Sequence, residues 1–269
     1  MFNRLLEYWN EDKGTYTRSE KIADYVSKCV GESFRKQFLD DKPFEKHTLR
    51  MSQIGKPLIL LCLHKIGYLD LPSTNFKQDW IFSLGDVVEA YLMSLVHMCG
   101  YVVESPQLEV ELYDIKGHID FLSSRDTVVE VKSMSDTYFR QFTRQPDDDR
   151  GYLTQLHMYC AALGTKRGVW LCLNKGTNEL AQVNLGWDDG VLQRSRAVVK
   201  AYNDCDGLDY IVQNVNPPDG VPERKGGVLT GRFIVPTSMR YSEYARAFYD
   251  MQGQYLISYK PNWYKEFEG

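Results

Sequence analysis

Two short segments that alternate between apolar and polar residues constrain this chain most. Residues 117–122 and 127–132 each repeat with a period of two, which is typical of β-strands, and only four residues separate them. We therefore expect an antiparallel hairpin. If the apolar side chains of both strands face one core, Leu122 pairs with Val128, and Asp120 then lies opposite Glu130.

Opposed carboxylates on neighbouring strands have Cβ atoms ~5 Å apart and repel each other. A divalent cation between them reverses the sign of that interaction, and Mg²⁺ commonly takes one or two protein carboxylates with water and phosphate oxygens. Lys132 shares the strand face of Glu130. This lysine forms a plain ion pair on a solvated hairpin, stabilises negative charge that develops on a phosphate, or positions an attacking water.

The rest of the sequence predicts an α/β chain. Helical spacing marks residues 17–38, 82–99, 152–164 and 187–205, and further strands are expected at 108–112, 169–173 and 180–183. Residues 52–67 predict a turn followed by a short apolar helix with Pro57 in its first turn. We expect 108–112, 117–122 and 127–132 to be three consecutive antiparallel strands. The stretch 206–231 is rich in Gly, Pro and Asp and predicts a mobile connection.

Two of the predicted helices carry polar residues that call for an explanation. Glu89 has apolar neighbours that predict a buried helix, and a buried carboxylate needs a partner. Gly85 lies four residues earlier on the same face and would admit another backbone closely. Gln155 and Tyr159 also share one helix face, either as functional groups or as a surface amide and a packed aromatic ring.

Composition excludes several classes of protein. The formal net charge of −4 argues against a histone-like nucleic-acid binder, although carboxylates that hold a metal would themselves lower the total. The six cysteines contain no C-x-x-C pair, which argues against a zinc ribbon or a clustered redox motif. Because we find no apolar run near ~20 residues and no secretory start, we expect a cytoplasmic protein without a membrane partner.

The candidate residues fall into four short motifs, Gly85-x3-Glu89, Gly117-His-Ile-Asp120, Glu130-Val-Lys132 and Gln155-x3-Tyr159. Together they resemble the PD-(D/E)XK nuclease superfamily, and their order and spacing are similar to its RecB-like branch, which includes phage recombination exonucleases and CRISPR-associated nucleases. The similarity spans about residues 83–173, and residues 51–55 resemble the branch's N-terminal motif more weakly. It implies a restriction-endonuclease-like core with a mixed central sheet flanked by helices and with helical additions.

The resemblance implies a role for each matched residue. Asp120 and Glu130 would bind the metal with the backbone carbonyl of Val131, Glu89 would complete the metal site, and Lys132 would be the catalytic lysine. Gln155 and Tyr159 would position that lysine and contact the substrate. His118 would reach the metal or a phosphate, or lie behind the metal ligands. The implied cofactor is Mg²⁺, with Mn²⁺ able to substitute.

The sequence also departs from the superfamily's pattern. Ile119 stands where the signature proline precedes the first acid. The iron-sulfur members carry one cysteine near the N-terminal motif and three near the C-terminus. Only Cys62 lies near residues 51–55, and residues 235–242 have serines where the other cysteines would stand. We therefore expect no iron-sulfur cluster.

The implied function is that of a metal-dependent DNA exonuclease built as a single nuclease domain. Its catalytic core would span about residues 80–185, with an N-terminal helical region at 1–79 and a C-terminal extension at 186–269. Its substrate would be duplex ends or single strands. Its setting would be phage recombination, phage replication or host DNA degradation, in the host cytoplasm and with a phage recombination or replication protein as partner.

Basic residues would line the DNA path, the alternative being scattered solubilising charge: Arg140, Arg144, Arg150, Lys166, Arg167, Lys225, Arg232 and Arg240. Other readings of the chain remain open. One is a structure- or sequence-selective endonuclease of the same superfamily. Another is a module that binds DNA or a replication protein without cleaving, and a third is an unrelated metal-binding protein.

Overall fold

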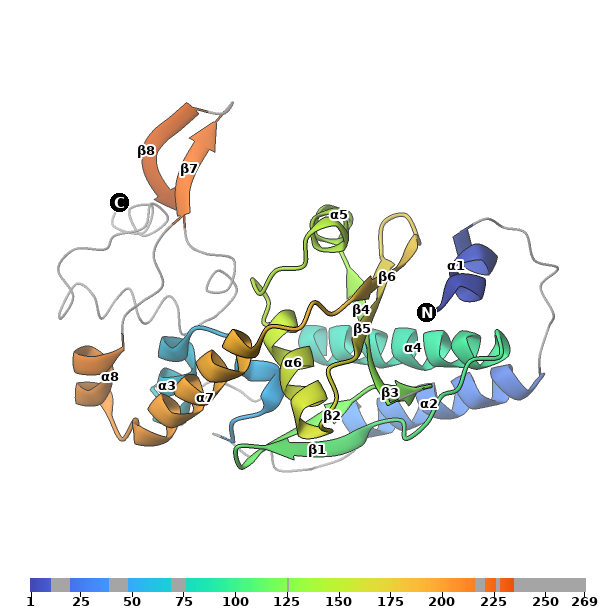
Figure 1. Ribbon diagram of the computed structural model, residues 1–269, viewed down its shortest axis with the longest axis horizontal. Helices are drawn as coiled ribbons and strands as arrows, with labels where there is room; N and C mark the ends of the chain where they lie inside the picture. Colours follow the sequence, from blue (N-terminus) through green and yellow to red (C-terminus); the bar gives the residue numbers. More distant parts are fainter. Residues whose placement is uncertain are drawn as a thin grey trace. The chain divides into compact units, whose positions relative to one another are not determined.

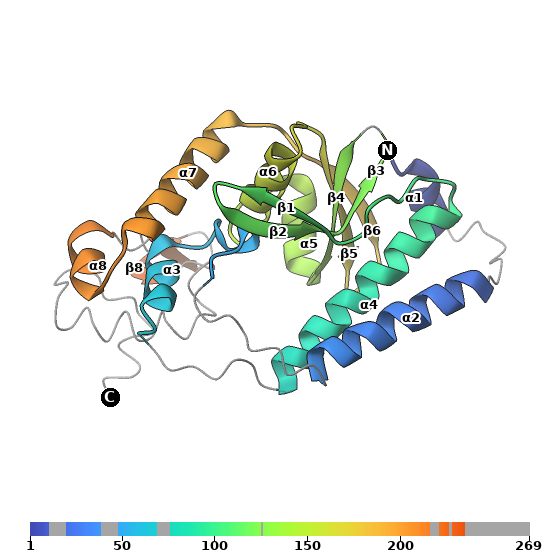
Figure 2. The ribbon, with the colours of Figure 1, turned by 90° about the horizontal axis from the view of Figure 1, so that it is seen from below.

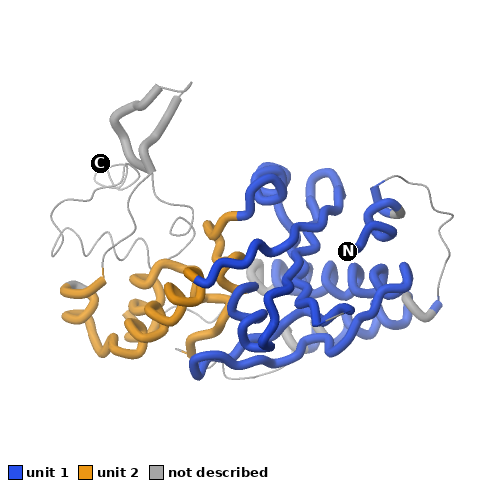
Figure 3. Tube along the Cα trace, viewed as in Figure 1, with its two compact units in different colours: residues 1–44, 72–146, 156–189 blue, residues 45–71, 147–155, 190–269 orange. Residues whose placement is uncertain are grey.

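The computed structural model of the chain describes residues 1–10, 20–38, 48–68, 76–124, 126–215, 221–225 and 228–234. The chain divides into two compact units whose segments alternate along the sequence (Figure 3). Unit 1 consists of Met1–Phe44, Pro72–Pro146 and Leu156–Asp189. Unit 2 consists of Glu45–Leu71, Asp147–Gln155 and Gly190–Gly269.

Unit 1 is built around a four-stranded mixed sheet with the strand order β3-β4-β5-β6 (Figure 1). The strands are β3 (Phe121–Ser123), β4 (Thr127–Met134), β5 (Gly168–Asn174) and β6 (Leu180–Asn184). Strands β4 and β5 are parallel, and the other two pairs are antiparallel. A parallel pair needs a long crossover, which here contains α5 (Asp136–Arg144) and α6 (Tyr152–Ala162). The expected class, a mixed sheet flanked by helices, is confirmed.

Both faces of the central strands are covered. On one face, α4 (Phe76–Met98) packs through Leu92, Leu95 and Val96 against Phe121, Val129, Val131, Val169 and Leu171. On the other face, Phe142 of α5 meets the ring of Trp170 edge to face, with ring centroids 5.3 Å apart. A Cβ at Gly168 would lie 2.8 Å from Leu156, so α6 lies directly against β5. Polar residues of β4 that face α5 and α6 are therefore shielded from water.

Helix α4 runs beside α2 (Glu20–Phe38) in Figure 2. It ends at Met98 and is followed by Gly100, whose φ of 79° suits glycine. Its segment Trp80–Met98 has the length and composition of a membrane span, with a mean hydropathy of 1.3. The expectation of no such apolar run was therefore wrong, because only Asp86 and Glu89 interrupt it. Buried core helices can have this length and apolar composition too. The C-terminal half of α4 packs in the core of unit 1.

Helix α1 (Asn3–Asn10) lies along the edge strand β6. The side-chain amide of Asn10 donates to the carbonyl oxygen of Leu180 at 2.8 Å and accepts from the Leu180 N–H at 3.1 Å. The N–H of Phe2 donates to the Gln182 side chain at 2.7 Å. An open strand edge is thus paired with polar groups of the helix.

The predicted register of the hairpin is confirmed, because Leu122 pairs with Val128. The predicted strand 117–122, however, is interrupted at Asp120. Residues before the interruption form β2 (Ile115–Ile119), which pairs with β1 (Leu108–Leu112) in a separate two-stranded sheet, and residues after it form β3. The three expected strands therefore do not form one sheet. The interruption arises because Asp120 uses its side chain and its carbonyl for hydrogen bonds outside a strand ladder.

Unit 2 contains the short helix η1 (Met51–Gln53), α3 (Leu58–Lys65), α8 (Leu208–Asn214) and most of α7 (Asp189–Asp204). It also contains a hairpin of β7 (Val221–Lys225) and β8 (Val228–Ile234), so regular elements occur where we expected a mobile connection. Lys65 donates to the carbonyl oxygens of Tyr202 and Asn203 at 2.7 and 2.9 Å. This cation satisfies backbone carbonyls at the C-terminal end of α7.

Candidate functional site

Asp120 and Glu130 form the centre of the candidate site. Asp120 lies at the interruption between β2 and β3, and one of its carboxylate oxygens accepts the backbone N–H of Val131 at 2.6 Å. Glu130 belongs to β4 and immediately precedes Val131. Burial raises the pKa of Asp120 well above its usual range, and the negative charges of Glu130 and Glu89 raise it further. When both acids are ionised, their charges therefore repel each other.

Glu130 is the most enclosed of these acids, with 1% of its surface exposed. Its Oε2 accepts from the Lys132 ammonium at 2.7 Å, whereas its Oε1 has no hydrogen-bond partner among the described residues. A buried carboxylate oxygen without a donor is costly, so native structures rarely contain one unless a water or an ion satisfies it. This orphan oxygen indicates a group that the described residues do not supply.

Lys132 is the basic side chain at the centre of this cluster. Its side chain is 16% exposed, and its charge lowers the pKa of Asp120, Glu130 and Glu89 against the effect of burial. One ammonium group therefore faces three carboxyl groups. When all three are ionised, the charge of the cluster is not balanced, and a bound cation would balance it.

Glu89 projects from α4 and is half-buried. Burial is the main cause that raises its pKa from 4.5 to about 7, and the charges of Glu130 and Asp86 add to it. Its Oε1 accepts from Nε2 of Gln107 at 2.5 Å. Gln107 could not be selected from the sequence, because a Pro-Gln pair before a strand has the composition of an ordinary turn. Only the fold brings this amide to the acid.

The donor set fits a hard cation that keeps most of its water ligands. The described residues contain no preformed group of three His, Cys, Asp or Glu side chains that could hold a metal ion. Mg²⁺, however, usually takes only one or two protein carboxylates, and the oxygens of Asp120 and Glu130 are ligands of that kind. The orphan oxygen of Glu130 is the atom that such an ion would satisfy.

Gly85 does not do what its position in the motif led us to expect. A Cβ built there meets nothing within 4 Å among the described residues, and the glycine is exposed on α4. The expected close approach of another backbone at this point was wrong, because Gly85 itself lies on an exposed part of α4, although Glu89 one turn later is half-buried.

A close approach occurs instead at Gly55, in the N-terminal motif. A Cβ at Gly55 would lie 2.2 Å from Cα of Gly151, whose φ of 77° itself suits glycine. Gly151 immediately precedes α6, which carries Gln155 and Tyr159. Both side chains are buried, so the alternative of a surface amide at Gln155 was wrong. The first turn of α6 is held by Asp148, whose carboxylate accepts from the N–H and the hydroxyl of Thr154.

The structure places His118 away from the carboxylate cluster. It lies on the exposed side of β2, where its Nε2 is 3.7 Å from a carboxylate oxygen of Glu109. The same glutamate forms a 2.7 Å ion pair with Lys116. The side chain that we considered for the metal or a phosphate is therefore positioned by a surface acid on the neighbouring strand.

The expected DNA-contacting residues lie at several places. Arg140 and Arg144 are exposed on α5, which follows the C-terminal end of β4. Lys166 and Arg167 are exposed just before β5, at the opposite end of the parallel pair, and Lys166 lies 3.6 Å from Asp189 and over the Trp187 ring. Arg150 belongs to unit 2. Arg240 and the side chains of Lys225 and Arg232 lie outside the described residues.

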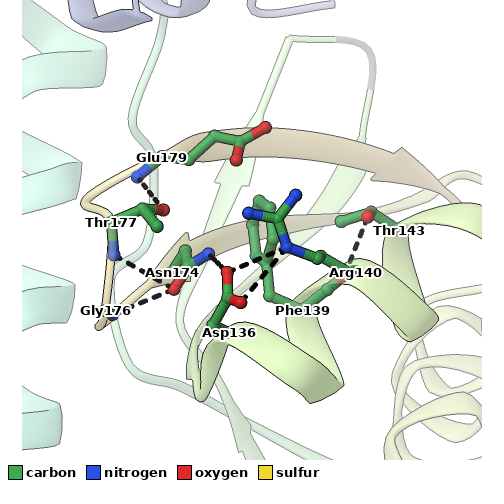
Figure 4. A network of polar contacts seen from close by, with 8 residues as sticks. All are labelled: Asp136, Phe139, Arg140, Thr143, Asn174, Gly176, Thr177 and Glu179. Carbon is green, nitrogen blue, oxygen red and sulfur yellow. Dashed lines mark hydrogen bonds and ion pairs between the residues drawn. The ribbon is translucent and has the colours of Figure 1, made fainter.

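Arg140 is held by a polar network at the ends of α5 and β5 (Figure 4). The buried Asn174 accepts from the N–H groups of Gly176 and Thr177 and donates to Asp136 at 2.7 Å. Both carboxylate oxygens of Asp136 in turn accept from Nε of Arg140, at 3.0 and 3.2 Å. The two terminal nitrogens of the guanidinium point away from Asp136 in Figure 4. The hydrogen bond to Asp136 is the main cause that raises the pKa of Arg140, and the charge of Glu179 adds to it.

No protein-family model and no curated protein matches this chain. Solved structures similar to it include an alkaline exonuclease, LHK-Exo, from Laribacter hongkongensis, with a TM-score of 0.43 and 10% identity over 65% of this chain and 91% of that chain. They also include a phage-related exonuclease from Haemophilus somnus 129PT, with a TM-score of 0.40 and 11% identity over 59% of this chain and 92% of that chain. At such TM-scores and identities, we infer neither a family nor an activity from the likeness.

Proposed function

We propose that the protein is a metal-dependent nuclease that hydrolyses phosphodiester bonds of DNA and acts as an exonuclease. The observation that carries this proposal is the buried Oε1 of Glu130, which lacks a hydrogen-bond donor among the described residues although a second acid lies beside it. Two buried acids, one of them with an oxygen that has no donor, are costly for the folded protein. A cation bound between them would offset this cost.

Asp120 and Glu130 would hold the metal, with the backbone carbonyl of Val131 and the carboxylate of Glu89 as further ligands. We propose Mg²⁺ as the cofactor, with Mn²⁺ able to replace it, because the ligands are carboxylate and carbonyl oxygens. When bound, such an ion polarises the phosphate and lowers the pKa of a water molecule that attacks it.

Lys132 supplies the positive charge that the protein itself brings to the reaction. Its ammonium is held 2.7 Å from Glu130, so it stays beside the metal-binding acids without needing to be ordered during the reaction. We propose that it stabilises the negative charge that develops on the phosphate. Gln155 and Tyr159, buried on α6, would position this lysine and contact the substrate.

The substrate path would use the basic residues that the structure leaves exposed. Arg140, whose outer nitrogens point away from its own acid, and Arg144 are the first candidates for phosphate contacts. We propose duplex ends or single strands as the substrate. A role in phage recombination, phage replication or host DNA degradation, with a phage protein as partner and in the host cytoplasm, completes the proposal.

A digestion of two DNA forms tests it. End-labelled linear duplex and covalently closed circular duplex are incubated with the protein and Mg²⁺, in parallel with samples that contain EDTA. We expect the linear DNA to be degraded, the circle to stay intact and EDTA to stop the reaction. A nicked circle would show that the protein is an endonuclease and not an exonuclease. DNA that is bound but never cut, with any metal, would leave only a binding module.

A further inference from the structure

Gln107 touches two of the three acids of the candidate site. Its backbone N–H donates to the carbonyl oxygen of Asp120 at 3.0 Å, and its side-chain Nε2 donates to Oε1 of Glu89 at 2.5 Å. Glu89 comes from helix α4, whereas Asp120 comes from the interrupted strand. One residue therefore links the helix acid to the strand acid.

The loop that carries Gln107 is tied to the segment around Asp120. Glu104 and Leu122 exchange two backbone hydrogen bonds of 2.8 Å each. Between this bridge and β1, Ser105 and Gln107 have φ values of 46° and 55°, a left-handed conformation that ordinary side chains rarely adopt. A non-glycine residue kept in such a conformation, held by hydrogen bonds on both sides, is a feature that clusters at functional sites.

The chemistry of the amide explains why glutamine suits this position. A carboxylate only accepts hydrogen bonds, so the amide must turn its NH₂ group to Glu89. This bond uses Oε1 of Glu89 and leaves Oε2 for another partner. Because the amide is neutral, it fixes the carboxylate without cancelling the charge that attracts a cation, which a lysine or arginine at this position would do.

We infer that Gln107 is a positioning residue that holds Glu89 in place beside Asp120, so that both acids can bind one divalent cation. The inference rests on the proposed function, since it presumes the metal site. Partners that orient a metal ligand from behind typically account for a 10–100-fold difference in metal affinity. Gln107 acts on the affinity for the metal, and the phosphate is handled by other residues.

The test measures Mn²⁺ binding by calorimetry in the full chain without DNA, for the wild type, Gln107→Asn and Gln107→Gly. Asparagine and glycine both tolerate the left-handed backbone, so neither substitution adds strain, but neither side chain spans the distance to Glu89. We expect Mn²⁺ to bind about tenfold or more weakly to both variants. Ser105→Gly, which changes the same loop at the other left-handed position, is the matched control and should leave the affinity unchanged.

The same substitution made in a Glu89→Gln variant shows whether Gln107 acts through Glu89 or through a general effect on the structure. In Glu89→Gln, the residue that Gln107 would orient has lost its charge, so adding Gln107→Asn should not weaken Mn²⁺ binding any further. Cleavage by Gln107→Asn at saturating Mn²⁺ should approach the wild-type rate, whereas the Mn²⁺ concentration needed for half the rate should rise about tenfold.

The outcomes distinguish this inference from the proposed function. If the wild type binds Mn²⁺ and cleaves DNA but both Gln107 variants bind Mn²⁺ as tightly, the inference is wrong and the nuclease stands. Equal losses in the wild-type and Glu89→Gln backgrounds, or a loss in Ser105→Gly, would also overturn it. If the wild type itself neither binds Mn²⁺ nor cleaves DNA, the proposed function fails and the inference fails with it.

Discussion

Glu130 and Lys132 point to the same side of β4 and form an ion pair of 2.7 Å that is almost entirely enclosed by protein. The pair uses one carboxylate oxygen of Glu130 and leaves the other without a donor among the described residues. It is thus a half-satisfied pair, in which the lysine stabilises an acid that still has capacity to bind a cation.

Lys132→Met removes the ammonium and keeps the length of the side chain. Breaking a buried pair by removing one partner costs about 3–5 kcal/mol, so the metal-free variant should melt at a lower temperature than the wild type. Added Mn²⁺ should raise its melting temperature more than that of the wild type, because the cation takes over the charge of the lysine. Cleavage should fall at least about a hundredfold while Mn²⁺ binding persists.

Lys200→Met is the control for that variant, because Lys200 forms an exposed ion pair with Asp204. This substitution should change neither the melting temperature nor the cleavage rate measurably. Asp120→Ala, in contrast, should lose both Mn²⁺ binding and cleavage. If Lys132→Met cleaved DNA at the wild-type rate, the lysine would have no role in the reaction.

The pH dependence of stability follows from Glu89, whose pKa in the folded protein is raised from 4.5 to about 7. A raised carboxyl pKa means that the folded state binds the proton more tightly. The stability that this proton contributes is present below about pH 4.5 and is lost as the pH rises through about 7. Metal-free wild type should therefore lose stability relative to Glu89→Gln between about pH 5 and 8, as measured by thermal unfolding. Parallel curves for the two proteins would contradict the assigned shift.

Gly55→Ala tests the close approach of two backbones in unit 2. The added Cβ would lie 2.2 Å from Cα of Gly151, which has no flexible side chain that could move aside. Overpacking of this kind costs about 1–3 kcal/mol, so chemical denaturation should show a less stable protein. Gly85→Ala is the matched control, because it enters open space on a helix and should be neutral or stabilising by up to about 1 kcal/mol. A destabilised Gly85→Ala, or a neutral Gly55→Ala, would refute the packing described for these glycines.

Arg140→Gln tests whether α5 contacts DNA. Each lost phosphate contact should reduce the slope of log affinity against log salt concentration by about 1 and weaken binding to all sequences alike. Lys28→Gln removes a similarly exposed charge that forms an ion pair with Glu32 on α2, so it should leave the slope unchanged. Equal effects of the two substitutions would favour scattered solubilising charge over a defined path for DNA.

Much of the site could be predicted from the sequence because the period of two fixes both strand faces and register. The pairing of Leu122 with Val128 followed from placing apolar side chains on one side, and Asp120 and Glu130 followed from that register. The part of helix α4 from residue 82 onwards, with its acid Glu89, was likewise visible in the spacing of apolar residues, whereas the helix begins at Phe76. Such local patterns predict secondary structure well, because the element forms in the way that buries its apolar face.

The remaining features depend on contacts between residues distant in sequence. The interruption at Asp120 arises because its side chain binds the N–H of Val131 and its carbonyl binds Gln107, neither of which alters the alternating pattern. The same is true of the bond from Gln107 to Glu89 and of the contact between Gly55 and Gly151. The motif could suggest that Gly85 admits a backbone, but only the packing of α4 shows open space there.

The most direct test of the metal site is the anomalous diffraction of crystals soaked in Mn²⁺. We predict a peak beside Asp120 and Glu130, within about 2.5 Å of Oε1 of Glu130, which has no donor in the part of the chain that the structure describes. The peak should vanish in crystals of Asp120→Ala soaked in the same way. A wild-type crystal with no peak at saturating Mn²⁺, or with a peak only elsewhere in the molecule, would contradict the proposal that these acids hold the catalytic metal.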